Sequence, residues 1–151
     1  MAALSIRPAG ITDIDDLLSL LHLLFSIEKD FVFDTARVRH GLALMLASKQ
    51  SVVLVAEESG QVIGMCTGQL TISTAEGGPA LLVEDVVVRQ GQQGRGVGRA
   101  LLHALEGWAR SRDIGRLQLL ADRNNDPALA FYTKLGWQAT ELICLRRRPG
   151  L

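Results

Sequence analysis

The chain has 151 residues, of which 48% are hydrophobic and 21% are charged. This is the composition of an ordinary globular protein, and the length predicts a single domain spanning residues 1–151. The 16 Lys and Arg residues balance the 16 Asp and Glu residues. The chain therefore lacks the basic excess of a general nucleic-acid binder or of a protein that binds anionic membranes, and we expect neither as a partner.

The cysteines and histidines predict no metal site. Cys66 and Cys144 stand far apart in the sequence, and the histidines His22, His40 and His103 fall in no metal-binding or nucleophilic pattern. No apolar run reaches the roughly 20 residues that span a bilayer, and the N-terminus lacks the pattern of a secretory signal. We therefore expect reduced thiols and a cytoplasmic protein.

Hydrophobic periodicity divides the chain into helices and strands. Apolar residues at three- and four-residue spacing predict amphipathic helices, whereas β-branched runs between turn residues predict strands. Paired strands followed by a strand–helix–strand unit indicate a mixed sheet with helices on both faces. In chain order, the predicted elements are a strand at 4–7, a helix capped by Thr12 or Asp13, a helix capped by Asp34 or Thr35, strands at 51–57, 61–71 and 81–88, a helix from Val97, a strand at 117–121, a helix at 127–135 and a last strand at 137–146.

Residues 91–98 form a glycine-rich loop that opens a predicted helix. Glycine lets backbone amides turn toward a ligand without a Cβ in the way, and a helix N-terminus adds unpaired N–H donors and the positive end of the helix dipole. Arg89, Arg95 and Arg99 add full charges, and no acidic residue occurs within residues 86–105. The loop therefore predicts an anion site suited to phosphate oxygens.

The spacing of this loop excludes two common phosphate-binding motifs. A Rossmann motif would need glycine at Arg99, and a P-loop would need lysine at Val97. The loop does fit the pattern Q-x-x-G-x-G, which runs from Gln93 through Gly96 to Gly98.

A second motif stands about thirty residues downstream of the loop. Residues 125–137 read N-x-x-A-x-x-F-Y-x-K-L-G followed by an aromatic residue. With the glycine loop, this segment resembles the GNAT superfamily of acyl-CoA-dependent N-acetyltransferases. The resemblance covers roughly residues 81–137. It implies the GNAT fold, an α/β architecture in which a mixed, mostly antiparallel sheet of six to seven strands is flanked by about four helices, and acetyl-CoA as the co-substrate.

The resemblance also implies roles for individual residues. Backbone groups of Val86 and Val88 would pair with the pantetheine arm, and the loop amides would hold the pyrophosphate. This sequence departs from the common pattern at Gln93, where arginine is frequent, and at Trp137, where phenylalanine is frequent. The implied cofactor-binding residues are Val86, Val88, Gln93, Gly94, Arg95, Gly96, Val97, Gly98, Arg99, Asn125 and Tyr132.

Glu84 is the candidate general base. An alkylammonium of pKa about 10.4 is neutral in only about one molecule in 2,500 at pH 7, so a base would assist attack on the thioester. Strand alternation puts Glu84 on the same face as Val86 and Val88. A β-bulge would reverse this and bring Asp85 in instead. Contact through a water molecule is as compatible with the sequence as direct contact.

Tyr132 is the candidate general acid, because a tyrosine of pKa near 10 can protonate a departing thiolate whose thiol has a pKa of about 8.5. The alternative is a tyrosine that only hydrogen-bonds the sulfur or packs. A backbone amide near Val88 would serve the oxyanion.

The acceptor is expected beside residues 26–34, the segment that borders the acceptor in the family. Residues 11–34 hold six acids and one lysine, which would attract a cationic amine, although the same acids could equally cap helices and face solvent. The predicted substrate-binding residues are Glu28, Asp30, Phe31, Phe33 and Glu84.

We therefore expect an enzyme that moves an acetyl group to a primary amine, by direct attack in a ternary complex. A small-molecule acceptor is expected ahead of a protein N-terminus or lysine. The alternative from another class is a module that senses acyl-CoA without turnover. The resemblance also allows a homodimer.

Overall fold

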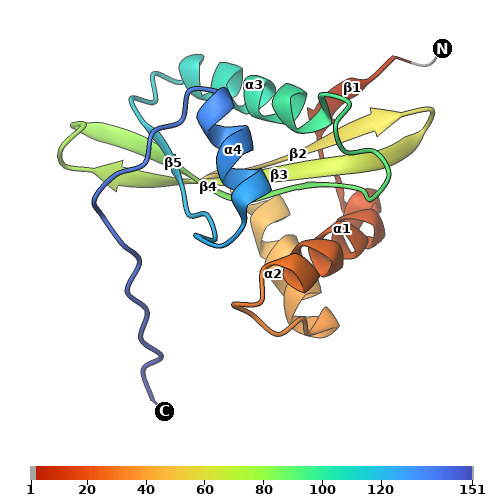
Figure 1. Cartoon of the computed structure of the whole chain (residues 1–151), viewed down its shortest axis with the longest axis horizontal. Helices are drawn as coiled ribbons and strands as arrows, with labels where there is room; N and C mark the ends of the chain where they lie inside the picture. Colours follow the sequence, from red (N-terminus) through yellow and green to blue (C-terminus); the bar gives the residue numbers. More distant parts are fainter. Residues whose placement is uncertain (1–2, 151) are drawn as a thin grey trace. The chain divides into compact units, whose positions relative to one another are not determined.

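The computed structural model describes residues 3–150. The chain divides into two compact units, Met1–Leu119 and Leu120–Leu151, which are described one at a time (Figure 1). Within the described residues, no helix is both long enough and apolar enough to cross a bilayer.

The first unit is built on one five-stranded sheet. The strands lie in the sheet in the order in which they occur in the sequence, and neighbours are antiparallel except for the parallel pair at the end of that order. They are β1 (Ser5–Pro8), β2 (Ser51–Glu58), β3 (Gln61–Ser73), β4 (Gly78–Val88) and β5 (Leu117–Leu119), with β4 and β5 as the parallel pair. The predicted mixed sheet is confirmed.

Helices cover both faces of this sheet (Figure 1). Helices α1 (Ile14–Ile27) and α2 (Thr35–Ala47) bury their apolar sides against one face, in a core that includes Met65 of β3 and Val87 of β4. Helix α3 (Val97–Arg110) packs on the other face. It approaches β3 so closely at Gly64 that an added Cβ would lie 3.1 Å from Val97. Two helical layers therefore enclose the sheet.

The caps explain where the N-terminal helices begin. The Asp34 carboxylate accepts a hydrogen bond from the Arg37 amide at 3.1 Å, so Asp34, not Thr35, caps α2. Asp13 ends a short 3-10 turn, Ile11–Asp13, and stands at the N-cap of α1, but its side chain makes no cap bond to that helix.

The second unit contains α4 (Asp126–Lys134). The Asn125 side chain accepts from the Ala128 amide at 3.2 Å at the start of this helix. At its end, Gly136 has a φ of +92°, and the Trp137 amide donates to the Tyr132 carbonyl at 3.0 Å. This is a Schellman ending, which requires a residue that tolerates the left-handed conformation.

The predicted last strand at 137–146 is wrong. Residues 138–150 form neither helix nor strand, and Leu142 and Leu145 are 87% and 86% exposed. An extended segment becomes a strand only when a neighbour supplies a hydrogen-bonded ladder, and no strand forms within residues 120–150 of its own unit. The sheet consequently has five strands rather than the predicted six to seven.

A partly buried charge cluster connects β1 to the start of α1. The Arg7 guanidinium donates to both oxygens of Asp13, at 2.9 and 3.0 Å, and to Glu57 of β2 at 2.5 Å. The Gly10 amide donates to Asp13 at 2.7 Å. Asp13 is only 6% exposed. Hydrogen bonds from Arg7 hold the pKa of its carboxyl below the usual 3.8.

We expect Asp13→Asn to lower the free energy of unfolding by about 1–3 kcal/mol at pH 7, because it leaves Arg7 without its main counter-charge. The Arg7 side chain is 37% exposed, which favours the lower end of that range. A carboxyl whose pKa is lowered by folding stabilises the protein above its unfolded pKa, and this contribution is lost as the pH falls through the folded pKa. Urea denaturation at pH 7 and in acid should therefore show the difference from wild type shrinking in acid.

The matched control is Asp15→Asn, which removes an exposed pair to Arg39 at 3.0 Å and should change the free energy of unfolding by less than about 1 kcal/mol. Equal losses for the two variants would contradict the structural role of Asp13.

Candidate active site

The glycine loop joins β4 to α3 and adopts a backbone that glycine favours. Gly91, Gly94 and Gly96 have φ values of +86°, +78° and +84°, in the left-handed region that residues with a Cβ rarely enter. A Cβ added at any of the three would meet no heavy atom within 4 Å. The glycines therefore serve the chain's conformation, and the space beside them is open.

The loop and the first turn of α3 present unpaired amides. The Gln92 amide donates to the Arg89 carbonyl at 3.0 Å, and pairing resumes where the Ala100 amide donates to the Gly96 carbonyl at 3.0 Å. Between them, the N–H groups of residues 93–99 find no acceptor within residues 3–150. Such a run at a helix N-terminus can hold an anion. It coincides with the predicted pyrophosphate site.

The exposed edge of β4 leads into this loop. β5 pairs only with residues 81–83 of β4, and none of the described strands pairs with that edge at residues 86–88. The Arg89 amide donates to Ile63 of β3 at 2.7 Å. Because backbone groups alternate along a strand, those of Val86 and Val88 point to the unpaired edge. An extended ligand could form hydrogen bonds with this edge in the way that an additional strand would.

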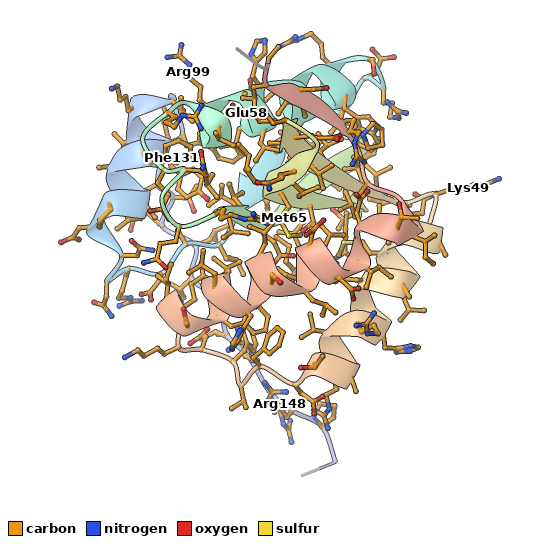
Figure 2. The ribbon with its side chains drawn as sticks, turned by 90° about the vertical axis from the view of Figure 1, so that its right-hand side faces the viewer. Lys49, Glu58, Met65, Arg99, Phe131 and Arg148 are labelled. Atoms are coloured by element: carbon orange, nitrogen blue, oxygen red, sulfur yellow. The ribbon has the colours of Figure 1, made fainter. Side chains whose placement is uncertain are left out.

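The arginines of the loop are not equivalent. Arg95 donates to both oxygens of Glu58, at 3.0 and 3.1 Å, and also to the Gln92 side chain. Arg89 lies 3.9 Å from Asp16. Arg99 projects outward from the first turn of α3 (Figure 2), and no carboxylate within residues 3–150 pairs with it. Of the predicted charges, Arg99 is therefore the most available to phosphate.

A β-bulge interrupts β4 at the predicted catalytic carboxylates. Cys66 of β3 pairs with Val86 and Gly68 pairs with Val83, so the single residue Thr67 stands opposite both Glu84 and Asp85. The extra residue reverses the alternation along β4.

The bulge turns both carboxylates toward the face covered by α1 and α2. Asp85 bonds to Thr67 and Glu84 bonds to Gln69, and both partners share the face of Met65, which packs in the α1–α2 core. Val86 pairs with Cys66, whose thiol lies 3.8 Å from the Leu101 carbonyl of α3. The expectation that Glu84 shares a face with Val86 is therefore wrong. The bulge is present, but it does not bring Asp85 to the face of Val86 either, because both carboxylates lie on the opposite face.

Asp85 has the environment of a proton acceptor. Its carboxylate accepts from the Thr67 hydroxyl at 2.8 Å, and its amide donates to the same hydroxyl oxygen at 3.1 Å. Burial, with a smaller contribution from the nearby Glu84 charge, raises the pKa of Asp85 to about 6, although the Thr67 bond opposes the shift. Glu84 is exposed and accepts from the Gln69 side chain at 3.1 Å. The geometry thus separates a half-buried carboxylate from an exposed one.

The predicted acceptor segment lies between α1 and α2 and forms an aromatic cluster. Phe33 lies 4.7 Å from His22 and 5.7 Å from Phe25, measured between ring centroids, and Phe31 lies 6.0 Å from Phe25. Phe33 is half-buried and Phe31 is exposed, as is Asp30, whereas Glu28 is half-buried. The predicted substrate-binding residues therefore all belong to the side of the sheet that carries Glu84 and Asp85.

The other two predicted residues, Asn125 and Tyr132, belong to the second unit. Asn125 uses its side-chain oxygen to cap α4, a local role that its position before Asp-Pro could have suggested. The Tyr132 ring lies 5.2 Å from that of Phe131 and 6.0 Å from that of Trp137. The aromatic residues of the second motif therefore contact one another within the second unit.

Sequence reasoning missed two residues that fix predicted site side chains by hydrogen bonds. Thr67 is completely buried and bonds to Asp85, and the Glu58 carboxylate accepts from Arg95. Neither belongs to a motif, and no local signal links residues so distant in sequence.

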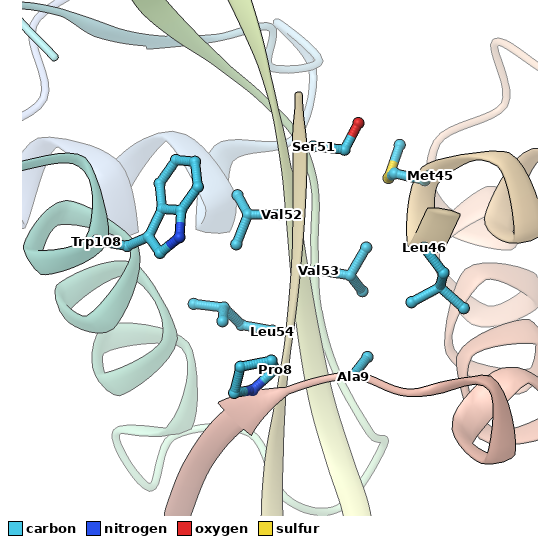
Figure 3. A pocket seen from close by; sticks show the side chains of 9 residues that line it. All are labelled: Pro8, Ala9, Met45, Leu46, Ser51, Val52, Val53, Leu54 and Trp108. Atoms are coloured by element: carbon cyan, nitrogen blue, oxygen red, sulfur yellow. The ribbon is translucent and has the colours of Figure 1, made fainter. Parts of the chain in front are cut away.

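A cavity of about 210 Å³ lies elsewhere, at the edge of β2 (Figure 3). Except for Ser51, its lining side chains are apolar, with Trp108 on the α3 side of the strand and Met45 on the α2 side. The lining residues are Pro8, Ala9, Met45, Leu46, Ser51, Val52, Val53, Leu54 and Trp108. None of the predicted site residues is among them.

Comparison with known proteins identifies relatives. The model of the acetyltransferase (GNAT) family matches residues 16–137. Over 64 residues, 42% of this chain and 19% of the relative, the chain is 45% identical to N-alpha-acetyltransferase 80 of Mus musculus. Over 74 residues, 49% of this chain and 39% of the relative, it is 32% identical to streptothricin acetyltransferase of Streptomyces lavendulae. The matched regions thus cover less than half of either curated relative.

The fold is shared over nearly the whole chain. The structure of an aminoglycoside N-acetyltransferase in complex with CoA superposes with a TM-score of 0.84, covering 99% of this chain and 97% of that one at 17% identity.

Proposed function

Because the chain belongs to the acetyltransferase (GNAT) family, we propose that it is an acyl-CoA-dependent N-acetyltransferase that moves an acetyl group from acetyl-CoA to a primary amine of a small molecule. The observation that carries this proposal is the continuity between the unpaired edge of β4 at residues 86–88 and the unpaired amides of residues 93–99. An extended pantetheine arm and a diphosphate require these two features in this order.

The residues present fit coenzyme A. Val86 offers its backbone N–H and carbonyl to the amides of the arm and Val88 offers its N–H, whereas the Val88 carbonyl already accepts from the Gln93 side chain at 3.3 Å. The loop amides and the dipole of α3 offer donors to phosphate oxygens. Arg99 adds a charge at the first turn of α3. The pairing of Asn125 with the arm remains a prediction from the family resemblance.

We assign acceptance of the amine proton to the carboxylates at the bulge, with Asp85 preferred to Glu84. Deprotonating an alkylammonium at pH 7 costs about 4.6 kcal/mol, and a base works best when its pKa lies near the working pH. The pKa of Asp85, raised to about 6, meets this condition. In this assignment, the exposed Glu84 attracts the cationic acceptor, and a bridging water is compatible with either residue.

The departing thiolate needs a proton donor, and Tyr132 is the candidate. The family resemblance supports this role, since Tyr132 occupies the tyrosine position of the second motif, and a tyrosine hydroxyl is a sufficient acid toward a thiolate. The contacts of its ring with Phe131 and Trp137 limit the directions in which the hydroxyl can point.

The acceptor class follows from the charge and shape of the α1–α2 segment. Glu28 and Asp30 stand beside the aromatic cluster of Phe31 and Phe33, a combination that favours a cationic amine. The streptothricin acetyltransferase relative is in keeping with a small-molecule acceptor. The N-alpha-acetyltransferase relative supports the second candidate, the N-terminal amine of a peptide.

Titration calorimetry with CoA and a thiol-release assay with acetyl-CoA test the proposed function. The assay panel should contain polyamines, aminoglycosides, amino acids and peptides. We expect CoA to bind and a cationic small amine to accelerate thiol release. Binding without acceleration by any amine would favour a sensing module, acceleration by peptides alone would favour the second candidate, and absence of CoA binding would contradict the proposal.

Asp85→Asn should lower kcat/KM by about 10²–10⁴ with the best amine, because the positioned base is lost. The wild-type rate should fall as the pH drops through about 6, the pKa of Asp85, since the protonated carboxyl cannot accept a proton. A pH–rate profile of wild type, Asp85→Asn and Glu84→Gln measures this. Glu84→Gln should still lose activity as the pH falls through about 6. If this fall in rate disappeared in Glu84→Gln but not in Asp85→Asn, the general base would be Glu84.

Tyr132→Phe should lower turnover by about 10²-fold or more while leaving the Kd for CoA within a few-fold, because the variant keeps the ring and removes only the proton donor. Steady-state kinetics and calorimetry on the same preparation separate the two effects. Unchanged turnover would remove Tyr132 as the acid.

A further inference from the structure

The amides that form the proposed phosphate cradle have little to hold them in place. The N–H groups of residues 93–99 donate to no backbone carbonyl within residues 3–150. No heavy atom lies within 4 Å of where a Cβ would stand at Gly94 or Gly96. Glycine-rich segments lose more conformational entropy on ordering than others. A site built from such a loop gains affinity if another group orders it before the ligand arrives.

Side chains supply this order. Gln93 donates from its side chain to the Val88 carbonyl at 3.3 Å, and Arg95 donates to the Gln92 side chain. Both bonds join residues within five positions of each other in sequence. The third tie, from Arg95 to Glu58, joins residues 37 positions apart and connects the loop to the hairpin of β2 and β3.

The Arg95–Glu58 contact involves both oxygens of the carboxylate. One guanidinium nitrogen of Arg95 lies 3.0 and 3.1 Å from the two carboxylate oxygens. The Glu58 side chain is only 23% exposed and that of Arg95 is 49% exposed, so the pair is screened less than a fully solvated one. Arg95 stands between Gly94 and Gly96, and fixing its side chain therefore restrains the peptide units on both sides.

We propose that Glu58 is a positioning residue for coenzyme A: its carboxylate holds Arg95 and thereby keeps the loop amides ready for phosphate oxygens. The inference rests on the proposed function, because it concerns the same cradle. It also predicts the direction in which the Kd for coenzyme A changes when Glu58 is replaced. A carboxylate near bound phosphates repels them, so Glu58→Gln would tighten binding if repulsion dominated, whereas it weakens binding if Glu58 orders the loop.

Titration calorimetry with CoA on Glu58→Gln tests the direction of this change in Kd. We expect the Kd to rise about threefold to fivefold, the upper part of the range for losing a partly exposed ion pair, with at most a small fall in the thermal midpoint. The matched control is Glu76→Gln, which removes another Glu–Arg pair, to Arg116 at 3.3 Å, in the turn between β3 and β4. Its Kd should equal that of wild type.

A double-mutant cycle separates the route through Arg95 from a direct effect of the Glu58 charge. In the Arg95→Gln background, Glu58→Gln should have no further effect on the Kd, because the tie is already broken. With an active amine, the KM for acetyl-CoA should rise while kcat at saturation is retained, a split that general destabilisation would not produce.

The outcomes distinguish the inference from the proposed function. A wild-type protein that does not bind CoA would overturn both. Binding by wild type with an equal or lower Kd for Glu58→Gln, or an undiminished effect of Glu58→Gln in the Arg95→Gln background, would overturn the positioning role and leave the proposed function standing.

Discussion

Unpaired backbone is the constraint on which the proposed site depends. A buried N–H group without an acceptor costs free energy, so the amides of residues 93–99 must face solvent or an anion. The glycines in the left-handed conformation allow this exposure. Helix α3, which follows the loop, is anchored to the core by Val97, which is 2% exposed. An open loop on a rigid helix can exchange water for phosphate oxygens without rearranging the core.

The bulge in β4 serves the other half of the site. A regular strand would alternate Glu84 and Asp85 between the two helical layers, whereas the bulge directs both toward the face covered by α1 and α2. Burying a carboxylate opposes folding and raises its pKa, as it does for Asp85. The same burial that destabilises the fold brings this pKa near the pH at which a base is effective, so the proposed proton acceptance and stability are opposed at this residue.

Carboxylates pair with some arginines of the loop and leave Arg99 available to a ligand. Glu58 engages Arg95 and Asp16 lies near Arg89, whereas no carboxylate of residues 3–150 pairs with Arg99. This division changes the meaning of the balanced net charge. Acids brought from β2 and α1 neutralise part of the loop's positive charge, and the carboxylates at the bulge and the α1–α2 segment lie on the opposite side of the sheet from α3.

Local pattern in the sequence determined the family, the glycine loop, the helices and the strands through residue 119, because hydrophobic period, caps and glycine positions act between near neighbours. Tertiary structure alone decided three matters. The bulge opposite Thr67 depends on the register between two strands, and the ion pair from Glu58 to Arg95 joins residues distant in sequence. The predicted strand at 137–146 would need a strand partner, and the described residues of its own unit, 120–150, form none. Each depends on which segments meet in space, and a hydrophobic pattern does not encode that pairing.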